Sequence, residues 1–196
     1  MDKEKNNGYT EILLAKEVDL QGIIDLQRKN LAFIVSDETK ENDGFVSIET
    51  NIDLLSDISN DIGIIVAKYK KKVIGYLFAV TVGISKKMPI LDKFVEDIGQ
   101  YEYMGKNVDK YRYCILGQIC IDNEHRGMGI FEKLYASFID NLKGDYDIGI
   151  GGICSNNPRS LHVHMKKLGL EVVSEYSEGG KQWYIVVLDF KKILFI

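Results

Sequence analysis

The sequence has few cysteines and no long apolar run. Its three cysteines, Cys114, Cys120 and Cys154, are an odd number and do not have the spacing of metal ligands. Each lies in an apolar stretch, so we expect three small buried side chains in a reducing compartment. The longest apolar stretch, residues 73–84, contains Gly and Tyr and is shorter than the ~20 residues that cross a bilayer.

Positive charge is not in excess either. The chain has 25 Lys and Arg against 29 Asp and Glu, a formal net charge of −4. It therefore offers no broad basic surface to a nucleic-acid backbone. Residues 1–8 are charged and lack the apolar centre of a signal peptide, and we expect them to be flexible. We predict a soluble, cytoplasmic protein that binds neither nucleic acid nor membranes.

The length and the apolar content indicate a folded protein. With 196 residues, of which 45% are hydrophobic, the chain is long enough for one domain with its own core. Global disorder is excluded because too many residues are aliphatic or aromatic. We therefore treat residues 1–196 as a single domain.

Apolar periodicity predicts alternating strands and helices. Strands are expected at 9–16, 62–69, 73–82, 111–122, 146–154, 170–176 and 183–188. Helices are expected at 18–31, 52–58, 130–142 and 157–168. The order is βα(α)ββ, an insert, and then βαβαββ, which predicts an α/β (α+β) domain around a mixed sheet.

Two segments fall outside this pattern. Residues 85–107 form an insert, for which the spacing of its apolar residues predicts helix. Its Tyr101 and Tyr103 either belong to the core or line a pocket. Residues 36–44 form a polar loop that is long for a compact domain, a feature typical of binding loops.

The segment 123–129 joins a strand to a helix. Gly127 and Gly129 allow a tight turn that leaves backbone N–H groups uncovered at a helix N-terminus, and Arg126 adds a cation. This arrangement suits a phosphate, although Gly-x-Gly alone is more typical of an ordinary strand-to-helix turn. It is neither a dinucleotide-binding fingerprint nor a Walker loop, since the third glycine and the Gly-Lys-Ser/Thr are missing.

The surrounding sequence resembles a known family. Residues 117–122 followed by 124–130, Glu-His-Arg-Gly-Met-Gly-Ile, resemble the acetyl-CoA-binding core of the GNAT N-acetyltransferase superfamily. Residues 157–164 and 168–171 resemble its next block, an Asn-x-x-Ser/Ala segment followed by Leu-Gly-Phe-Glu. Asp19-Leu20 and residues 73–76 are similar to its first helix and third strand.

The resemblance implies a single GNAT-like domain with a mixed, mostly antiparallel sheet flanked by helices. It also implies direct transfer of an acetyl group from acetyl-CoA, as co-substrate and without a metal, to a primary amine of a small molecule or protein. The pantetheine arm would contact the backbone of Ile119, Cys120 and Ile121. The pyrophosphate would lie over residues 126–131, which are Arg126, Gly127, Met128, Gly129, Ile130 and Phe131. Asn157 and Ser160 would contact the pantetheine or cap their helix.

The chain departs from the family pattern at two positions. The third small residue of the phosphate loop is replaced by Phe131, whose ring is expected to turn into the core. The Tyr that donates a proton to the departing thiolate is absent, and its position corresponds to His164 or Met165. His164 is our candidate general acid, because imidazole exchanges protons near neutral pH. The alternative is a histidine on the helix surface, as for His162.

Several questions stay open at this level. The general base is not selected among Glu49, Glu102 and Gln118. A CoA-binding regulatory module without turnover, or an acyltransferase that uses another acyl chain or acceptor, would share the same motifs. The apolar segment 193–196 needs a cover, and a homodimer would supply one.

Overall fold

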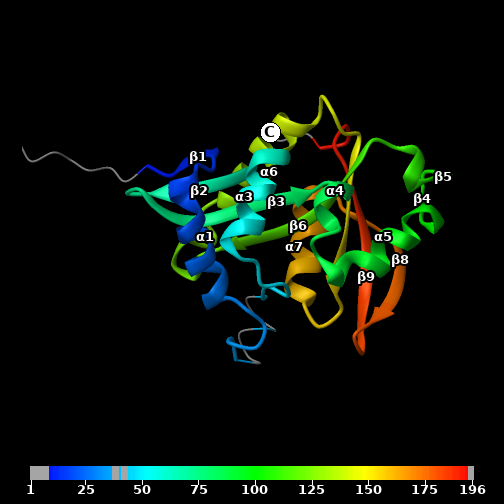
Figure 1. The fold of residues 1–196 in the computed structure, drawn as a ribbon, viewed down its shortest axis with the longest axis horizontal. Helices are drawn as coiled ribbons and strands as arrows, with labels where there is room; N and C mark the ends of the chain where they lie inside the picture. The colour runs from blue at the N-terminus through cyan, green and yellow to red at the C-terminus, as the bar shows by residue number, and fades with distance from the viewer. Residues whose placement is uncertain (1–8, 37–39, 41–43, 194–196) are drawn as a thin grey trace, which may run out of the picture.

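The computed structural model describes residues 9–36, 40 and 44–193 (Figure 1). The N-terminal segment 1–8, most of the loop 36–44 and residues 194–196 of the apolar end lie outside these ranges, so the predictions made for them are untested. Within the described ranges, no helix has both the length and the apolar character needed to cross a membrane. All three cysteines are buried and free, as predicted.

The predicted order of elements is confirmed. The strands of the main sheet are β1 (Glu11–Leu14), β2 (Ile64–Tyr69), β3 (Lys72–Val80), β6 (Tyr113–Ile121), β7 (Ile148–Cys154), β8 (Glu171–Glu178) and β9 (Lys181–Asp189). The longer helices are α1 (Glu17–Lys29), α3 (Ile52–Asp61), α6 (Ile130–Leu142) and α7 (Pro158–Leu168).

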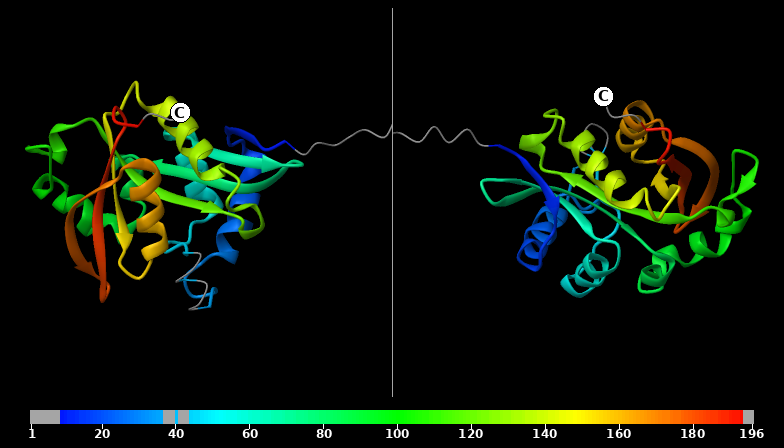
Figure 2. Two further views of the ribbon diagram at one scale, coloured as in Figure 1. Left: turned by 180° about the vertical axis from the view of Figure 1, so that it is seen from behind. Right: turned by 90° about the horizontal axis from the view of Figure 1, so that it is seen from above.

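These strands form one mixed sheet of seven in the order β1-β2-β3-β6-β7-β9-β8. All neighbours are antiparallel except β6 and β7, which are parallel. Figure 2 shows α1, α3 and the insert on one face of the sheet, with α6 and α7 on the other. The predicted α/β fold is therefore confirmed.

The alternation of side chains along the central strands builds a separate core on each face. On β3, Tyr76 and Phe78 belong to the core under α1, α3 and the insert, whereas Leu77 belongs to the core under α6. The apolar residues of α6 from Leu134 to Leu142 are buried there. Because both faces of β3 are covered, its residues are apolar without interruption.

The insert differs from its prediction. It begins earlier, with α4 (Val82–Ser85), and continues through η1 (Pro89–Leu91), α5 (Asp92–Asp97) and η2 (Ile98–Gln100). Its last part is a hairpin of β4 (Glu102–Tyr103) and β5 (Lys106–Asn107), followed by η3 (Val108–Lys110).

The hairpin was missed because two-residue strands are too short to produce a period, and its turn uses a left-handed methionine, Met104, at φ 49°. Tyr101 and Tyr103 are buried in the core, which decides between the two readings of these residues.

Candidate functional site

The main irregularity of the sheet is the separation of β6 from β7. The two strands pair only from Tyr113 to Ile115, opposite residues 148–150. At this point the register between β3 and β6 shifts by one residue, so that Gly117 forms a bulge. A Cβ at Gly117 would lie 2.5 Å from the ring of Phe78 and 2.9 Å from its carbonyl oxygen. Only glycine fits this bulge.

Glycines of β7 provide the other half of the gap. A Cβ at Gly149 would lie 2.5 Å from a methyl group of Leu116, and one at Gly151 would lie 2.9 Å from the Cβ of Leu116. The Leu116 side chain thus occupies the space that side chains of β7 would otherwise fill. Beyond it, β6 has no strand partner on this side among the described residues.

The unpaired edge of β6 exposes the backbone of alternate residues. Asp122 N–H donates to the Ile74 carbonyl at 2.8 Å, which places the backbone groups of residues 120 and 122 on the β3 side. The N–H and C=O of Ile119 and Ile121 therefore face the gap. The structure refines the set predicted for pantetheine: Ile119 and Ile121 present their backbones, whereas Cys120 only lines the neighbouring cavity. Burial raises the pKa of the Cys120 thiol to about 12, which makes it a poor nucleophile.

The turn after β6 leads directly into α6. After η4 (Asn123–His125), Gly127 and Gly129 have φ of 76° and 73°, and Gly129 is the N-cap of α6. A glycine N-cap has no side chain to satisfy the first N–H groups of the helix. Those donors and the positive end of the helix dipole form a site suited to an anion.

Arg126 fastens this turn to its surroundings. Its Nε donates to the Ile121 carbonyl at 3.1 Å, and its Nη2 donates to Asn30 Oδ1 at 3.3 Å. The Arg126 guanidinium was predicted to supply a cation for the phosphate. In the structure Arg126 lines a cavity that adjoins the turn before α6. Its hydrogen bonds hold the turn before α6 against β6 and the end of α1.

An ion pair joins the first turn of α6 to α7. Lys167 Nζ of α7 contacts Glu132 Oε1 at 2.5 Å and lies 5.7 Å from the centre of the Phe131 ring. Burial acts to raise the pKa of Glu132, but the hydrogen bond and the charge of Lys167 together with a backbone hydrogen bond outweigh it, and the net shift is downward. The Phe131 ring is half-buried and packs on Tyr135 and His164, as its prediction required.

His164 is buried between α6 and α7. Its Nδ1 lies 2.7 Å from the Ser160 carbonyl, which can only accept, so Nδ1 carries the proton. Its Nε2 lies 2.8 Å from the Tyr135 hydroxyl and accepts from it. Burial lowers the pKa of His164 to about 4. The imidazole is therefore neutral at pH 7, and both of its nitrogens are occupied.

Asn157 caps α7. Its Oδ1 accepts from the Ser160 N–H at 3.3 Å, and its Nδ2 donates to the Phe45 carbonyl at 3.0 Å. Asn157 therefore caps its helix, which is one of the two roles predicted for it. Asn157 and Ser160 also line the cavities beside the gap.

Three connected cavities run through the sheet at the gap. One of about 190 Å³ adjoins the turn before α6, one of about 110 Å³ lies within the gap, and one of about 290 Å³ lies on the insert face. The first two share Ile119 and His164, and the last two share Gly117 and Trp183. The fold therefore offers a passage from the α6 face to the insert face.

Gln118 contributes an amide side chain to both the gap and the insert-side cavity. Gln118 Oε1 accepts from the Tyr76 hydroxyl and, at 2.8 Å, from Gln27 Nε2, while Gln118 Nε2 donates to the Ile48 carbonyl at 2.8 Å. Its carbonyl oxygen is therefore fully used, and one of its two amide hydrogens is donated. Glu49 pairs instead with Arg28, at 3.7 Å.

The carboxylates of the described cavity walls are those of Glu132 and Glu178, and Glu102 does not belong to them. The general base is therefore not identified among the three residues considered from the sequence.

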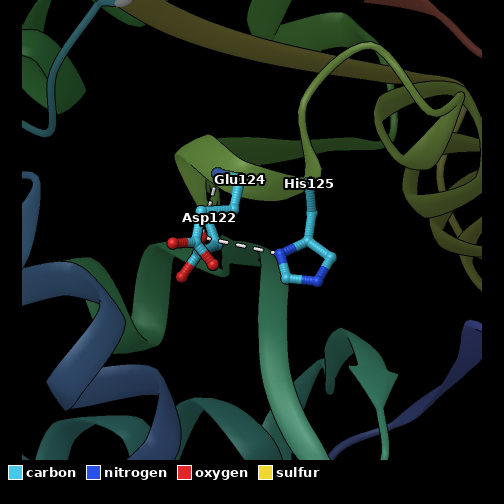
Figure 3. Close-up of side chains that lie close together, drawn as sticks. All are labelled: Asp122, Glu124 and His125. Carbon is cyan, nitrogen blue, oxygen red and sulfur yellow. Dashed lines mark hydrogen bonds and ion pairs between the residues drawn. The ribbon is translucent and has the colours of Figure 1, made fainter.

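A small cluster of possible metal ligands precedes the turn (Figure 3). Ligand atoms of Asp122, Glu124 and His125 lie within 4.8 Å of one another. Asp122 Oδ1 accepts from the Glu124 N–H at 3.1 Å and lies 3.5 Å from His125 Nδ1. These contacts lie within the short helix η4 and its N-cap residue, Asp122. We assign the cluster a structural role in the turn.

Sequence reasoning missed the aromatic walls of the passage. Tyr135 lies in the helix predicted at 130–142, and Tyr176 and Trp183 lie in the strands predicted at 170–176 and 183–188. Their apolar periodicity is that of core residues, and no local pattern separates a core ring from a ring that lines a cavity.

Comparisons with known proteins agree with this geometry. The model of the acetyltransferase (GNAT) family matches residues 31–170. No curated protein matches the chain. Among solved structures, yncA from Salmonella typhimurium, a putative acetyltransferase determined with acetyl-CoA, has 15% identity and a TM-score of 0.60, with 94% of this chain and 95% of that chain covered.

Two further solved structures show the same fold. The smu.2055 protein from Streptococcus mutans has 19% identity and a TM-score of 0.62, with 92% and 99% of the two chains covered. The ribosomal-protein-S18-alanine N-acetyltransferase from Escherichia coli has 10% identity and a TM-score of 0.59, with 95% and 100% covered.

Proposed function

Because this chain belongs to the acetyltransferase (GNAT) family and is an acyltransferase, we propose that it transfers the acetyl group of acetyl-CoA directly to the nitrogen of an amine. The observation that supports this most strongly is the glycine turn at the start of α6, which opens onto the passage through the sheet. An anion site at one end and a gap between strands suit a substrate with a phosphorylated head and a long polar arm.

Acetyl-CoA fits the residues of the α6 side. Its pyrophosphate would accept hydrogen bonds from the backbone N–H groups of residues 127–131, beside Arg126. Its pantetheine arm would extend along the gap-facing backbone of Ile119 and Ile121, much as a longer β7 would have done. The thioester would then lie in the gap, beside Gly117 and His164.

The reaction needs three things from this site. The neutral amine attacks the thioester carbon, the C–N bond forms, and the tetrahedral oxyanion requires a hydrogen-bond donor, for which we propose the Ile119 N–H. When the C–S bond breaks, the nitrogen has lost one proton and the thiolate gains one. The products are the acetylated amine and CoA.

His164, the proton donor proposed from the sequence, does not fit that role in this environment. An imidazolium is not available at pH 7, because burial holds the pKa of His164 near 4. Its one ring N–H proton, on Nδ1, is donated to the Ser160 carbonyl, and its loss would leave an imidazolate, so we propose that the thiolate takes the proton released by the amine nitrogen. The pH dependence of kcat should therefore show no group with a pKa near the ordinary ~6.5 of histidine.

Calorimetric titration of acetyl-CoA tests the proposal, with desulfo-CoA as an analogue that cannot transfer. We expect micromolar binding by the wild type and its loss in Arg126→Glu. Arg112→Glu is the matched control, because Arg112 also holds a backbone carbonyl and a side chain but lies at the opposite end of β6. Absence of binding by the wild type would contradict the proposal.

Thiol release then separates transfer from mere binding. An enzyme releases CoA when an amine is supplied, whereas a regulatory module binds acetyl-CoA and releases none. Comparison of acetyl-CoA with longer acyl-CoA substrates shows which acyl chain the gap accepts.

A further inference from the structure

The cavity on the insert face is lined mainly by apolar and aromatic side chains. Its floor is formed by Phe78 of β3 and by residues 115–118 of β6, and its opposite wall by Met88, Ile90 and Phe94 of the insert. The β8–β9 hairpin closes the side with Tyr176 and Trp183. At about 290 Å³ it is the largest of the three connected volumes.

Three aromatic rings follow one another along this wall. The centre of the Phe94 ring lies 6.4 Å from that of Tyr176, which lies 6.3 Å from that of Trp183 with an angle of 26° between the planes. Such a row presents flat apolar faces at a spacing that favours another ring or a saturated ring system.

Charge is confined to the rim of this cavity. The charged residues of its described wall are Glu178 and Lys181, both exposed at the tip of the hairpin. Gln118 Oε1 is already saturated by Gln27 and Tyr76, and Gln118 Nε2 donates one of its two hydrogens to the Ile48 carbonyl. Among the described wall residues, the unused side-chain polar groups of the interior are the Tyr176 hydroxyl and the second N–H of Gln118. These are too few to pair with a second cation or a peptide backbone, and burying either of those unpaired is unfavourable.

One polar atom faces inward near the gap. The Tyr176 hydroxyl has no hydrogen bond within the described residues, and it lies 3.7 Å from where a Cβ of Gly152 would be. Gly152 lines both the gap and the insert-side cavity. A nitrogen held by this hydroxyl would therefore lie at the junction where the thioester is expected.

We propose that the acyl acceptor is a small primary amine with a flat or cyclic apolar body, held between the insert and the β8–β9 hairpin with its nitrogen at the gap. This inference rests on the proposed acyl transfer and specifies its second substrate. In the balanced reaction, R–NH₂ and acetyl-CoA give R–NH–CO–CH₃ and CoA–SH. Polyamines and the N-termini of proteins are poorer acceptors, because their additional polar groups find no partners in the cavity.

Trp183 provides a direct test of acceptor binding, since it is the chain's one tryptophan and lies in the cavity wall. Its emission is followed during titration with 2-phenylethylamine, cyclohexylmethylamine, spermidine and a hexapeptide that begins with alanine. We expect saturable changes with the first two amines and a Kd at least ~10-fold weaker for the others. Equal or stronger binding of spermidine or the peptide would overturn the proposal, as would no response to the cyclic amines.

Two variants locate the binding. Phe94→Leu should weaken the binding of 2-phenylethylamine by about fivefold, because one aromatic ring is lost from the wall. Because Phe94 is buried, Ile90→Ser is the second variant, at a position 46% exposed, and should also weaken binding about fivefold. Ile52→Ser is the matched control, 41% exposed on α3 and outside the cavity. An effect of Ile52→Ser equal to that of Ile90→Ser would place the amine elsewhere.

Thiol release with the same amines gives the kinetic counterpart, with kcat/KM expected to follow the order of binding. The two proposals fail in different ways. Loss of acetyl-CoA binding in the calorimeter contradicts the proposed transfer without changing the Trp183 emission. Turnover of spermidine or the peptide, with the cyclic amines inactive, contradicts the acceptor class and leaves the transfer intact.

Discussion

The two ends of the passage through the sheet are built in different ways. On the α6 side, backbone groups form the site: the left-handed Gly127 and Gly129, the uncapped start of α6 and the free edge of β6. On the insert side, the rings of Phe94, Tyr176 and Trp183 form it. A backbone site needs glycines at set positions and so leaves a pattern in the sequence, whereas a side-chain wall looks like ordinary core.

Filling the bulge at Gly117 disturbs the strand that lines the whole passage and has the largest expected effect. Gly117→Val places side-chain atoms against Phe78 and its carbonyl, so we expect a loss of ~3 kcal/mol or more in the free energy of unfolding. Transfer should fall with it, since the thioester position depends on the bulge. Urea unfolding and thiol release measure the two effects. Gly144→Val, with open space around the Cβ, serves as control, and equal damage there would rule out this explanation.

The buried His164 makes the α6 side sensitive to acid. Its pKa is about 4 in the folded protein and ~6.5 when unfolded, so the unfolded chain binds more protons between these values. Its contribution to stability is complete above pH 6.5 and is lost as the pH falls toward 4, by about 3 kcal/mol in all.

Urea unfolding at pH 7 and pH 5 measures this loss. His164→Gln should remove that part of the pH dependence, while His162→Gln, at an exposed position two residues away, should keep it. The same slope in His164→Gln as in the wild type would show that another group is responsible.

Alanine substitutions at two glycines with positive φ distinguish an effect on stability from an effect on acetyl-CoA binding. Gly129→Ala and Gly180→Ala both place an alanine at a positive φ, 73° and 70°, with no neighbour within 4 Å of the new Cβ. Each should therefore cost a similar ~1–2 kcal/mol of stability. Acetyl-CoA affinity should fall only in Gly129→Ala, because Gly180 lies in the β8–β9 turn. If both variants bound acetyl-CoA equally well, the turn before α6 would not hold the phosphates.

The smallest effect concerns the ion pair beside the turn. Glu132 and Lys167 are both partly exposed, so Lys167→Met should change the free energy of unfolding by less than ~0.5 kcal/mol. The same change removes a cation from the wall of the cavity that adjoins the turn before α6. It should therefore weaken acetyl-CoA binding, and the difference in affinity from the wild type should shrink at high salt. Lys143→Met, which breaks an exposed pair on the far end of α6, should leave acetyl-CoA affinity unchanged.

Local patterns were sufficient for most of the fold and for half of the site. The apolar periods gave the order of strands and helices, because a strand or helix long enough to cover a core repeats its pattern several times. They failed at the hairpin of residues 102–107, whose strands have two residues each. The turn that suits a phosphate could be located because Gly127 and Gly129 are required by their dihedral angles.

The sequence by itself determined the family, the order of elements and the position of the turn that suits a phosphate, since each depends on residues close together in the chain. Only the tertiary structure decided that β6 leaves β7 after Ile115, that His164 is buried against Tyr135, and that Phe94 faces Tyr176 and Trp183. Those contacts join residues far apart in sequence. Their chemistry comes from burial and neighbours, which no local pattern of residues encodes.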